Sequence, residues 1–209
     1  MTRAHFFSLD GIDGAGKSTQ CQLLADWLRA LGHKVIECVD PGGTEVGAIL
    51  RTLLLGHRGH MNITCEALLF MASRAQLVAE VIRPALDAGS IVIADRFLLA
   101  NVVYQGYGSG LDRDRLYDLA RFATGGLEPD LTFVLDLPPD QALKRRKLMP
   151  DRLESRGSDF HERVCAGFRT EAKLRPDRIV LVDASQSAAL IQERIRREVT
   201  RVLDANPRP

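Results

Sequence analysis

Five short apolar segments divide the chain, and each of them ends on an aspartate. They are His5–Asp10, Lys34–Asp40, Ser90–Asp95, Leu131–Asp136 and Arg178–Asp183. The segments are rich in β-branched and aromatic residues, which is typical of strands buried on both faces of a parallel sheet. Because stretches with helical periodicity lie between them, the pattern predicts an α/β fold: a doubly wound, five-stranded parallel sheet flanked by helices.

The first helical stretch has a clear apolar face, and Gly32 is placed to end the helix. That face is predicted to hold Leu23, Leu24, Trp27, Leu28 and Leu31. Further helices are predicted at 45–56, 65–88, 112–125, 139–148, 158–174 and 187–204. Because Pro84 has no backbone N–H to donate, it should kink or break the 65–88 helix one turn before its end.

The carboxyl ends of the predicted strands are where a doubly wound sheet binds its ligands. The five aspartates lie there, so they are candidates for a site. Asp136 and Asp183 are expected only to cap the helix or turn that follows them.

Composition narrows the class of protein. The 209 residues are 45% hydrophobic, enough for the core of one domain spanning 1–209. The formal net charge of +1 gives no field that would attract nucleic acid or an acidic membrane surface. The four cysteines are far apart and have no histidine at metal-ligand spacing, which indicates structural thiols in a reducing compartment. With no apolar run long enough to span a membrane, we expect a cytoplasmic protein without nucleic-acid or membrane partners.

The first apolar segment runs directly into Gly11-Ile12-Asp13-Gly14-Ala15-Gly16-Lys17-Ser18-Thr19, which the first helix follows. Strand, Gly-x-x-x-x-Gly-Lys-Ser loop and helix in this order predict a phosphate-binding loop and a P-loop NTPase fold. The glycines let consecutive N–H groups surround a phosphate, and the helix adds its positive dipole end. Lys17 would reach the β- and γ-phosphates, and the Ser18 hydroxyl would bind the Mg²⁺ between them. The chain is therefore predicted to bind a nucleoside triphosphate.

Two features indicate a second, anionic substrate. Arg96 follows the third segment, and its planar guanidinium suits bidentate capture of a phosphate, although a surface ion pair is the alternative. The turn Asp40-Pro41-Gly42-Gly43-Thr44 is followed by Arg51, although a plain turn explains its glycines equally well.

A basic cluster at about 144–157 is a third such feature. Its cationic residues are Lys144, Arg145, Arg146, Lys147, Arg152 and Arg156. Such a run is usually a solvated helix face, but Met149-Pro150-Asp151 interrupts it, which favours a short basic lid. A lid arginine could stabilise the charge of a transferring phosphoryl group, and closure would exclude water. Spacing does not identify which arginine does so.

The ordered set of motifs closely resembles the bacterial thymidylate kinases over nearly the whole chain. Besides the phosphate-binding loop and residues 40–44, the matching segments are Leu50–Leu55, Glu66–Phe70 with Arg74, Asp95–Phe97, Tyr104–Gly106, Pro129–Thr132, Asp151–Arg152 and Val182–Ala184. The resemblance implies a homodimeric, Mg²⁺-dependent enzyme that moves the γ-phosphate of ATP to dTMP, giving dTDP and ADP for dTTP synthesis.

The resemblance also implies residue roles. It makes Asp13, Lys17, Arg96, Arg146 and Arg152 catalytic. It assigns ATP to residues 11–19 and to Asp183, beside adenine, and Mg²⁺ to Ser18 and Asp95. It assigns dTMP to Asp10, Pro41, Arg51, Phe70, Arg74, Arg96, Asn101, Tyr104 and Gln105.

Selection of the base has a simple physical basis in Arg74, which lies one helical turn from Phe70. A guanidinium only donates hydrogen bonds, so it favours the C4 carbonyl of thymine over the C4 amino group of cytosine. An unpaired buried donor costs about 1–3 kcal/mol, or roughly ten- to hundredfold in selectivity. Under the resemblance Asn101 faces the base edge and the Tyr104 ring lies under the sugar. Taken alone, Phe70 and Tyr104 are more typical of ordinary core aromatics.

Some positions depart from the family pattern. Asp10 and Asp40 stand where relatives usually have glutamate, so a metal or water contact made by the longer acid could be lost or bridged by water. Gly14 stands where the eukaryotic branch has an arginine, which fits the bacterial branch. Two alternatives stay open at this point: a P-loop kinase of another pyrimidine nucleotide or nucleoside, and a regulatory P-loop NTPase.

Overall fold

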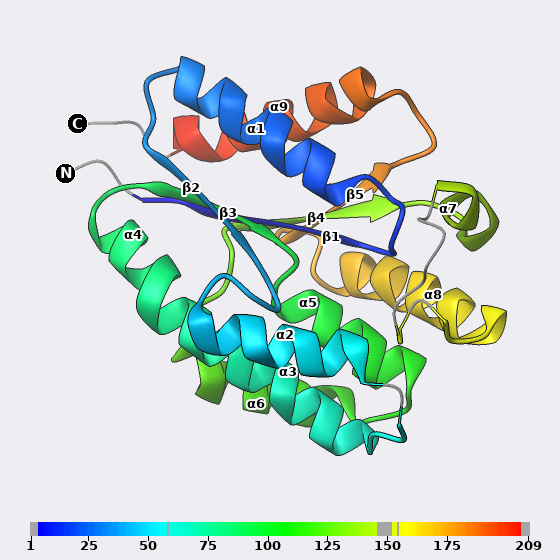
Figure 1. Ribbon diagram of the computed structural model, residues 1–209. Coiled ribbons are helices and arrows are strands. Elements are labelled where there is room, and N and C mark those ends of the chain that lie inside the picture. The colour runs from blue at the N-terminus through cyan, green and yellow to red at the C-terminus, as the bar shows by residue number, and fades with distance from the viewer. Residues whose placement is uncertain (1–3, 58, 146–151, 154, 206–209) are drawn as a thin grey trace.

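The structure, a computed structural model, describes residues 4–57, 59–145, 152–153 and 155–205 (Figure 1). One sheet holds five strands, which are β1 (Phe6–Gly11), β2 (Val35–Val39), β3 (Ile91–Asp95), β4 (Leu131–Asp136) and β5 (Ile179–Asp183). All neighbouring strands are parallel, in the order β2-β3-β1-β4-β5. Each strand coincides within one residue with the apolar segment that predicts it, so the prediction of a five-stranded parallel sheet is confirmed.

Helices cover both faces of the sheet (Figure 1). Above it in this view lie α1 (Lys17–Ala30) and α9 (Ala188–Ala205). Below it lie α2 (Glu45–Gly56), α3 (Ile63–Leu77), α4 (Arg83–Asp87), α5 (Leu98–Asn101), α6 (Arg113–Thr124) and α8 (Ser158–Leu174). The short helix α7 (Pro139–Arg145) lies beyond the carboxyl end of β4. The doubly wound arrangement is therefore confirmed.

Two helical segments differ from the prediction. The single helix expected at 65–88 is split into α3, the π-helical turn η1 (Val78–Ile82) and α4. The break expected near Pro84 lies just before it: Pro84 is the second residue of α4, and its ring crowds the preceding turn while it cannot donate a helical hydrogen bond. Helix α5 continues into a second π-helical segment, η2 (Val102–Gly108), which the sequence analysis did not predict.

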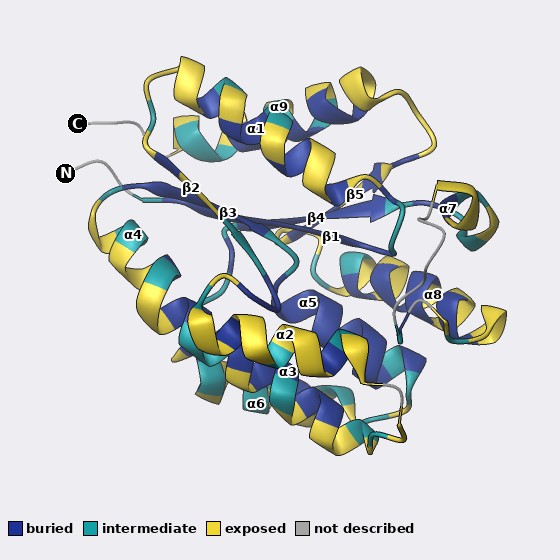
Figure 2. Ribbon diagram, viewed as in Figure 1, coloured by how far each residue is buried: buried dark blue, intermediate teal, exposed yellow. Residues whose placement is uncertain are grey.

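Burial follows the order of the strands (Figure 2). The central strands β1, β3 and β4 are buried almost throughout, as predicted. The edge strands β2 and β5 expose Ile36 and Leu181, so the expectation of burial on both faces was wrong for them. The predicted face of the first helix was wrong at Leu31, which lies beyond the end of α1 and is exposed, whereas Leu24 and Leu28 are fully buried.

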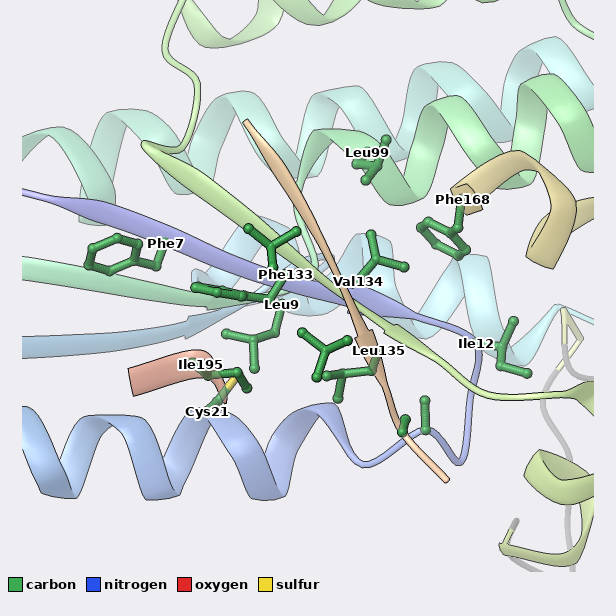
Figure 3. Close-up of a cluster of buried hydrophobic side chains, with 14 of the residues drawn as sticks. Phe7, Leu9, Ile12, Cys21, Leu99, Phe133, Val134, Leu135, Phe168 and Ile195 are labelled. Carbon is green, nitrogen blue, oxygen red and sulfur yellow. The ribbon is translucent and has the colours of Figure 1, made fainter. Parts of the chain in front are cut away.

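Close packing on both faces fixes the strand ends that form the site (Figure 3). Leu135 faces Cys21 and Ile195, from α1 and α9, whereas the neighbouring Val134 faces Phe168 on the other side. This alternation is that of a pleated strand. Each fully buried side chain of this size stabilises the fold by about 1.5–3 kcal/mol.

The connections create a crevice at the carboxyl edge. The β1-to-β2 connection runs through α1 on one face, and the β3-to-β4 connection runs through α5, η2 and α6 on the other. Because β1 and β3 are neighbours, their connections diverge between them, and an open sheet binds ligands at such a point. The glycine-rich loop follows β1 and Arg96 follows β3, so both reach the same crevice.

All four cysteines are free thiols, and Cys21 and Cys165 are buried, as a structural role requires, whereas Cys65 is exposed. Burial raises the pKa of Cys38 to about 12 and holds the pKa of Cys21 well above its usual value, so both stay protonated near neutral pH. Within the ranges given above, no helix has both the length and the apolar character that crossing a bilayer requires.

Candidate active site

A cavity of about 590 Å³ opens at the carboxyl edge of the sheet. It extends from the glycine-rich loop at one end to side chains of α2, α3 and η2 at the other. The predicted site residues that line it are Asp13, Gly14, Gly16, Lys17, Ser18, Thr19, Pro41, Arg51, Phe70, Arg74, Asp95, Arg96, Asn101, Tyr104 and Gln105. One cavity thus holds both the predicted triphosphate end and the predicted acceptor end.

Both backbone conformation and packing require glycine at Gly11 and at Gly14 of the loop. Gly11 and Gly14 have φ values of +136° and +87°, which L side chains rarely adopt. A Cβ on Gly14 would lie 2.6 Å from the carbonyl oxygen of Ala142, and one on Gly11 would lie equally close to that of Leu135. The loop is therefore packed against β4 and α7, with no room for a side chain on those sides.

Lys17 begins α1 and is held inside the loop. Its side chain is 7% exposed, and its Nζ donates to the carbonyl oxygen of Ile12 at 2.9 Å and lies 3.6 Å from an oxygen of Asp13. Burial, and then the charge of Arg96, lower the pKa of this ammonium group. No acidic residue occupies the first turn of α1, so the helix dipole and Lys17 both favour an anion here.

Ser18 and Asp95 bring two oxygen-bearing side chains together at the mouth of the loop. The Ser18 hydroxyl donates to Oδ2 of Asp95 at 2.5 Å, and both residues line the cavity. Across the part of the chain that the structure describes, no group of three His, Cys, Asp or Glu residues forms a metal cage. Mg²⁺ is usually held by one or two protein oxygens together with substrate phosphates, so this pair fits that ion.

Arg96 stands between the two ends of the cavity. Its guanidinium donates to the carbonyl oxygen of Gly11 at 2.8 Å and to the carboxylate of Asp13. It also lies over the Tyr104 ring, 5.2 Å from the centroid. Among the described residues, Arg96 alone has a positive φ (71°) without being glycine. Such a conformation costs about 1–3 kcal/mol and persists where the surroundings enforce it. The side chain lines the cavity, so its ion pair with Asp13 is part of the site.

The far end of the cavity is built around Arg74. This residue is 1% exposed, and its Nε donates to Asp40 at 2.6 Å. Its Nη1 donates to Oδ1 of Asn101 at 3.2 Å, and Nδ2 of Asn101 donates to Oε1 of Gln105 at 2.6 Å. Phe70 lies one turn before Arg74 and also lines the cavity. Nearby, Arg51 donates to the carbonyl oxygen of Pro41 at 2.7 Å. Hydrogen bonds among its own side chains therefore hold this end of the cavity in place.

Several predicted residues lie away from this cavity. Asp10 is buried behind the wall, and Gly11, Ile12 and Ala15 support the loop without lining it. Asp183 accepts hydrogen bonds from Ser185 and Gln186, so it caps a turn as expected. Asp136 instead pairs with Arg169, because α8 brings that guanidinium within 2.9 Å, and the expectation of a cap was wrong.

The arginines of the basic cluster differ in whether they line the cavity. Arg145 lines the cavity and donates to the carbonyl oxygen of Ala184 at 3.1 Å. Arg152 donates to the carbonyl oxygen of Leu54 and pairs with Glu66 at 2.6 Å, which holds its head group away from the cavity. Arg146, the predicted catalytic finger, lies outside the described residues.

Asp10 is an unsatisfied buried acid. No described group donates to either of its carboxyl oxygens. Burial raises its pKa from 3.8 to about 6, although the charges of Arg96 and Lys17 oppose the shift. Ionisation of Asp10 therefore lowers the free energy of unfolding of the protein.

Asp10→Asn should stabilise the protein at high pH. Because the folded pKa is the higher one, the free energy of unfolding of the parent falls as pH rises from about 4 to 6. A shift of this size corresponds to at most about 3 kcal/mol, which the variant would not lose at pH 8. Urea unfolding at pH 4 and pH 8 measures the difference, with the exposed Asp26→Asn as control. A difference that does not grow between these pH values would contradict the assignment.

Sequence reasoning missed several residues at the site. Val39, Leu55 and Leu153 line the cavity, but an isolated aliphatic residue carries no signal of its own. Glu66 was recognised only as part of a matching segment, and it is fully buried in contact with Gln105. Its spacing of four and eight residues from Phe70 and Arg74 places it on the same helix face, which was a usable signal.

Comparison with known proteins identifies this arrangement. A family model described as thymidylate kinase matches residues 9–195. The chain belongs to the thymidylate kinase family. It is 49% identical over 193 residues to a thymidylate kinase of Exiguobacterium sp., covering 91% of each chain. It is 47% identical to the Desulfovibrio desulfuricans thymidylate kinase, covering 87% of this chain and 88% of the relative.

A solved structure supports the same assignment. The crystal structure of thymidylate kinase from Ehrlichia chaffeensis matches with a TM-score of 0.80 and 28% identity, over 94% of this chain and 98% of that one. The P-loop NTPase fold and the family predicted from the motifs are thus confirmed. The prediction of an enzyme, an ATP:dTMP phosphotransferase, is confirmed as well, in preference to the two alternatives left open by the sequence.

Proposed function

We propose that this cavity carries the reaction with ATP phosphates on the glycine-rich loop and dTMP between Arg96 and Arg74. The observation that carries the proposal is the position of Arg96, which contacts Asp13 of the loop and lies over Tyr104 of the acceptor end. A single guanidinium therefore borders both anion sites. Two polyanions repel each other unless fixed cations lie between them, and these cations are already positioned.

Each residue then has a physical task. Lys17 neutralises charge on the β- and γ-phosphates, and Arg96 with Arg51 holds the phosphate of dTMP in line with them. Ser18 and Asp95 would hold Mg²⁺, which supplies charge neutralisation at the bridging oxygens when bound. Asp13 orients Arg96 and Lys17 through its carboxylate. We propose that Arg146 stabilises the charge of the transferring phosphoryl group, as the family resemblance implies. Arg145 is a second candidate for this role, because it lines the cavity.

Steady-state ADP release over a panel of acceptors tests this function. We expect dTMP to be preferred over dCMP, UMP and thymidine. dUMP should be a poor but detectable substrate, because the 5-methyl group adds only about 1 kcal/mol through burial. A preference for a cytosine nucleotide or a free nucleoside would reject dTMP as acceptor. Hydrolysis of ATP independent of any acceptor would instead indicate a regulatory NTPase.

Removal of Arg74 should narrow the preference for dTMP over dCMP. Because Arg74→Ala alone would leave Asp40 buried without its partner, at about 3–5 kcal/mol, the comparison is best made in the Asp40→Asn background. The ratio of kcat/KM for dTMP and dCMP should fall about tenfold between Asp40→Asn and the double variant. An unchanged ratio would exclude Arg74 as the group that reads the C4 substituent.

Three further expectations remain proposals. They are a homodimer, a cytoplasmic location, and one domain spanning 1–209 with a lid at about 144–157. Light scattering of the purified chain measures the first. We also propose that the loop after Asp183 lies beside the adenine of ATP. This proposal is supported by Arg145, which lines the cavity and donates to the carbonyl oxygen of Ala184 in that loop.

A further inference from the structure

Glu66 is a fully buried carboxylate to which no role in the reaction has been given. It lies on α3 and accepts hydrogen bonds from two sides. Its Oε2 meets Nη1 of Arg152 at 2.6 Å and Nη2 of Arg156 at 2.7 Å. Its Oε1 accepts from Nε2 of Gln105 at 2.7 Å. Two cations therefore balance the buried charge, and the remaining oxygen is directed to a residue that lines the cavity.

The contact with Gln105 begins a chain of amides that ends at Arg74. Gln105 Oε1 accepts from Asn101 Nδ2, and Asn101 Oδ1 accepts from Arg74 Nη1. An amide can be turned either way, since its oxygen accepts and its nitrogen donates. Here both ends of the chain are fixed, because a carboxylate only accepts and a guanidinium only donates. The two amides between them can then take one orientation only.

This orientation determines what the cavity offers to a base. The NH₂ group of Gln105 is used by Glu66, so its oxygen is on the side of Asn101, and the oxygen of Asn101 is on the side of Arg74. Each amide oxygen keeps a second lone pair. Acceptors therefore stand beside the N–H groups of Arg74, which complements a pyrimidine with an N3–H donor and a 4-carbonyl acceptor. A 4-aminopyrimidine has the reverse pattern.

We propose that Glu66 is a positioning residue that sets base selectivity by fixing the direction of the Gln105–Asn101 amides. The inference rests on the proposed function, because it specifies how the acceptor end of that site distinguishes pyrimidines. It also accounts for Arg152 and Arg156, which compensate the charge of Glu66 and so allow a carboxylate to remain buried there.

Glu66→Gln tests the inference with almost no change in shape. A glutamine at this position can turn its own NH₂ toward Gln105, which opposes the direction that Arg74 imposes on Asn101, so the two amides are no longer held in one orientation. We expect the ratio of kcat/KM for dTMP over dCMP to fall about tenfold, with kcat/KM rising for dCMP as well as falling for dTMP. Glu171→Gln is the matched control. Glu171 is 1% exposed and accepts from Tyr107 and Tyr117, so its loss removes a buried carboxylate without touching the amides. Its ratio should stay unchanged.

A charge-conserving double variant provides a rescue. In Glu66→Gln with Gln105→Glu, the carboxylate at 105 can only accept, so it restores the original direction of Asn101 and should recover most of the ratio. Gln105→Met, which keeps Glu66 and its arginines, should lose the ratio as Glu66→Gln does, and covers a failure of the first variant to fold.

The outcomes separate the inference from the function beneath it. If the parent protein does not prefer dTMP, the proposed function fails. If the parent prefers dTMP but neither Glu66→Gln nor Gln105→Met alters the ratio, the inference fails and the function stands. Equal losses of ratio in Glu66→Gln and Glu171→Gln would also overturn it, since a general loosening of the fold would then explain both.

Discussion

Lys17→Ala should lower kcat about 10²- to 10³-fold. The ammonium group is buried in the loop and bonded to the carbonyl oxygen of Ile12, so it is in place before ATP arrives. Arg96 is held by Asp13 and by the carbonyl oxygen of Gly11, and under the proposed function its guanidinium serves the phosphate of dTMP, so it would not replace Lys17. Single-turnover measurement of phosphoryl transfer at saturating ATP and dTMP checks the prediction.

The control for Lys17 is Lys34→Ala, which removes an exposed lysine immediately before β2. It should leave kcat within about twofold, as surface substitutions usually do. If Lys17→Ala raised only the KM for ATP, with kcat preserved, Lys17 would be a ground-state anchor and its proposed role in the transfer step would be wrong.

Arg96→Ala should separate the two substrates. We expect kcat/KM for dTMP to fall about 10²- to 10³-fold, because a charge-assisted, bidentate contact to the acceptor phosphate is lost. ATP affinity, measured by titration without dTMP, should change by less than about threefold. Comparable losses for both nucleotides would disprove the assignment of Arg96 to the acceptor side.

Arg96→Gly provides a matched comparison for the backbone. It loses the same guanidinium as Arg96→Ala but tolerates the φ value of 71° without strain. Its free energy of unfolding in urea should therefore be about 1 kcal/mol higher than that of the alanine variant. The loss of activity should be the same in both variants. Arg175→Ala, which breaks a half-buried pair with Glu128 elsewhere, controls for removal of a charge.

The sheet and the glycine-rich loop could be predicted because their signals are local. Continuous apolar segments have few alternatives to buried strands, and the glycines of the loop are required by the backbone itself, as Gly14 shows. The position of Arg96 followed from these two elements, because β3 lies beside β1. The turn made by Asp183 likewise depends on its neighbours in sequence.

What could not be predicted depends on contacts between distant segments. Segment η2 has glycines and an apolar run without a capping signal, so only packing against α8 decides its form. The sequence places Arg152 in a basic cluster, but the buried Glu66 on another helix draws its head group away. The family resemblance assigned Asp10 to dTMP. Its location behind the wall of the cavity depends on how β1 packs between its neighbouring strands.

The carbonyl oxygen of Ala142 that crowds Gly14 has a consequence for how the charge of the reaction is met. A phosphate loop pressed so closely against α7 has no space to carry a cation of its own at that position. Under the proposed function, further positive charge would come from a different part of the chain, and α7 ends in Arg145, which borders the cavity. The contact between Gly14 and Ala142 therefore excludes a side chain from the loop and also packs the loop against α7, the helix that carries Arg145.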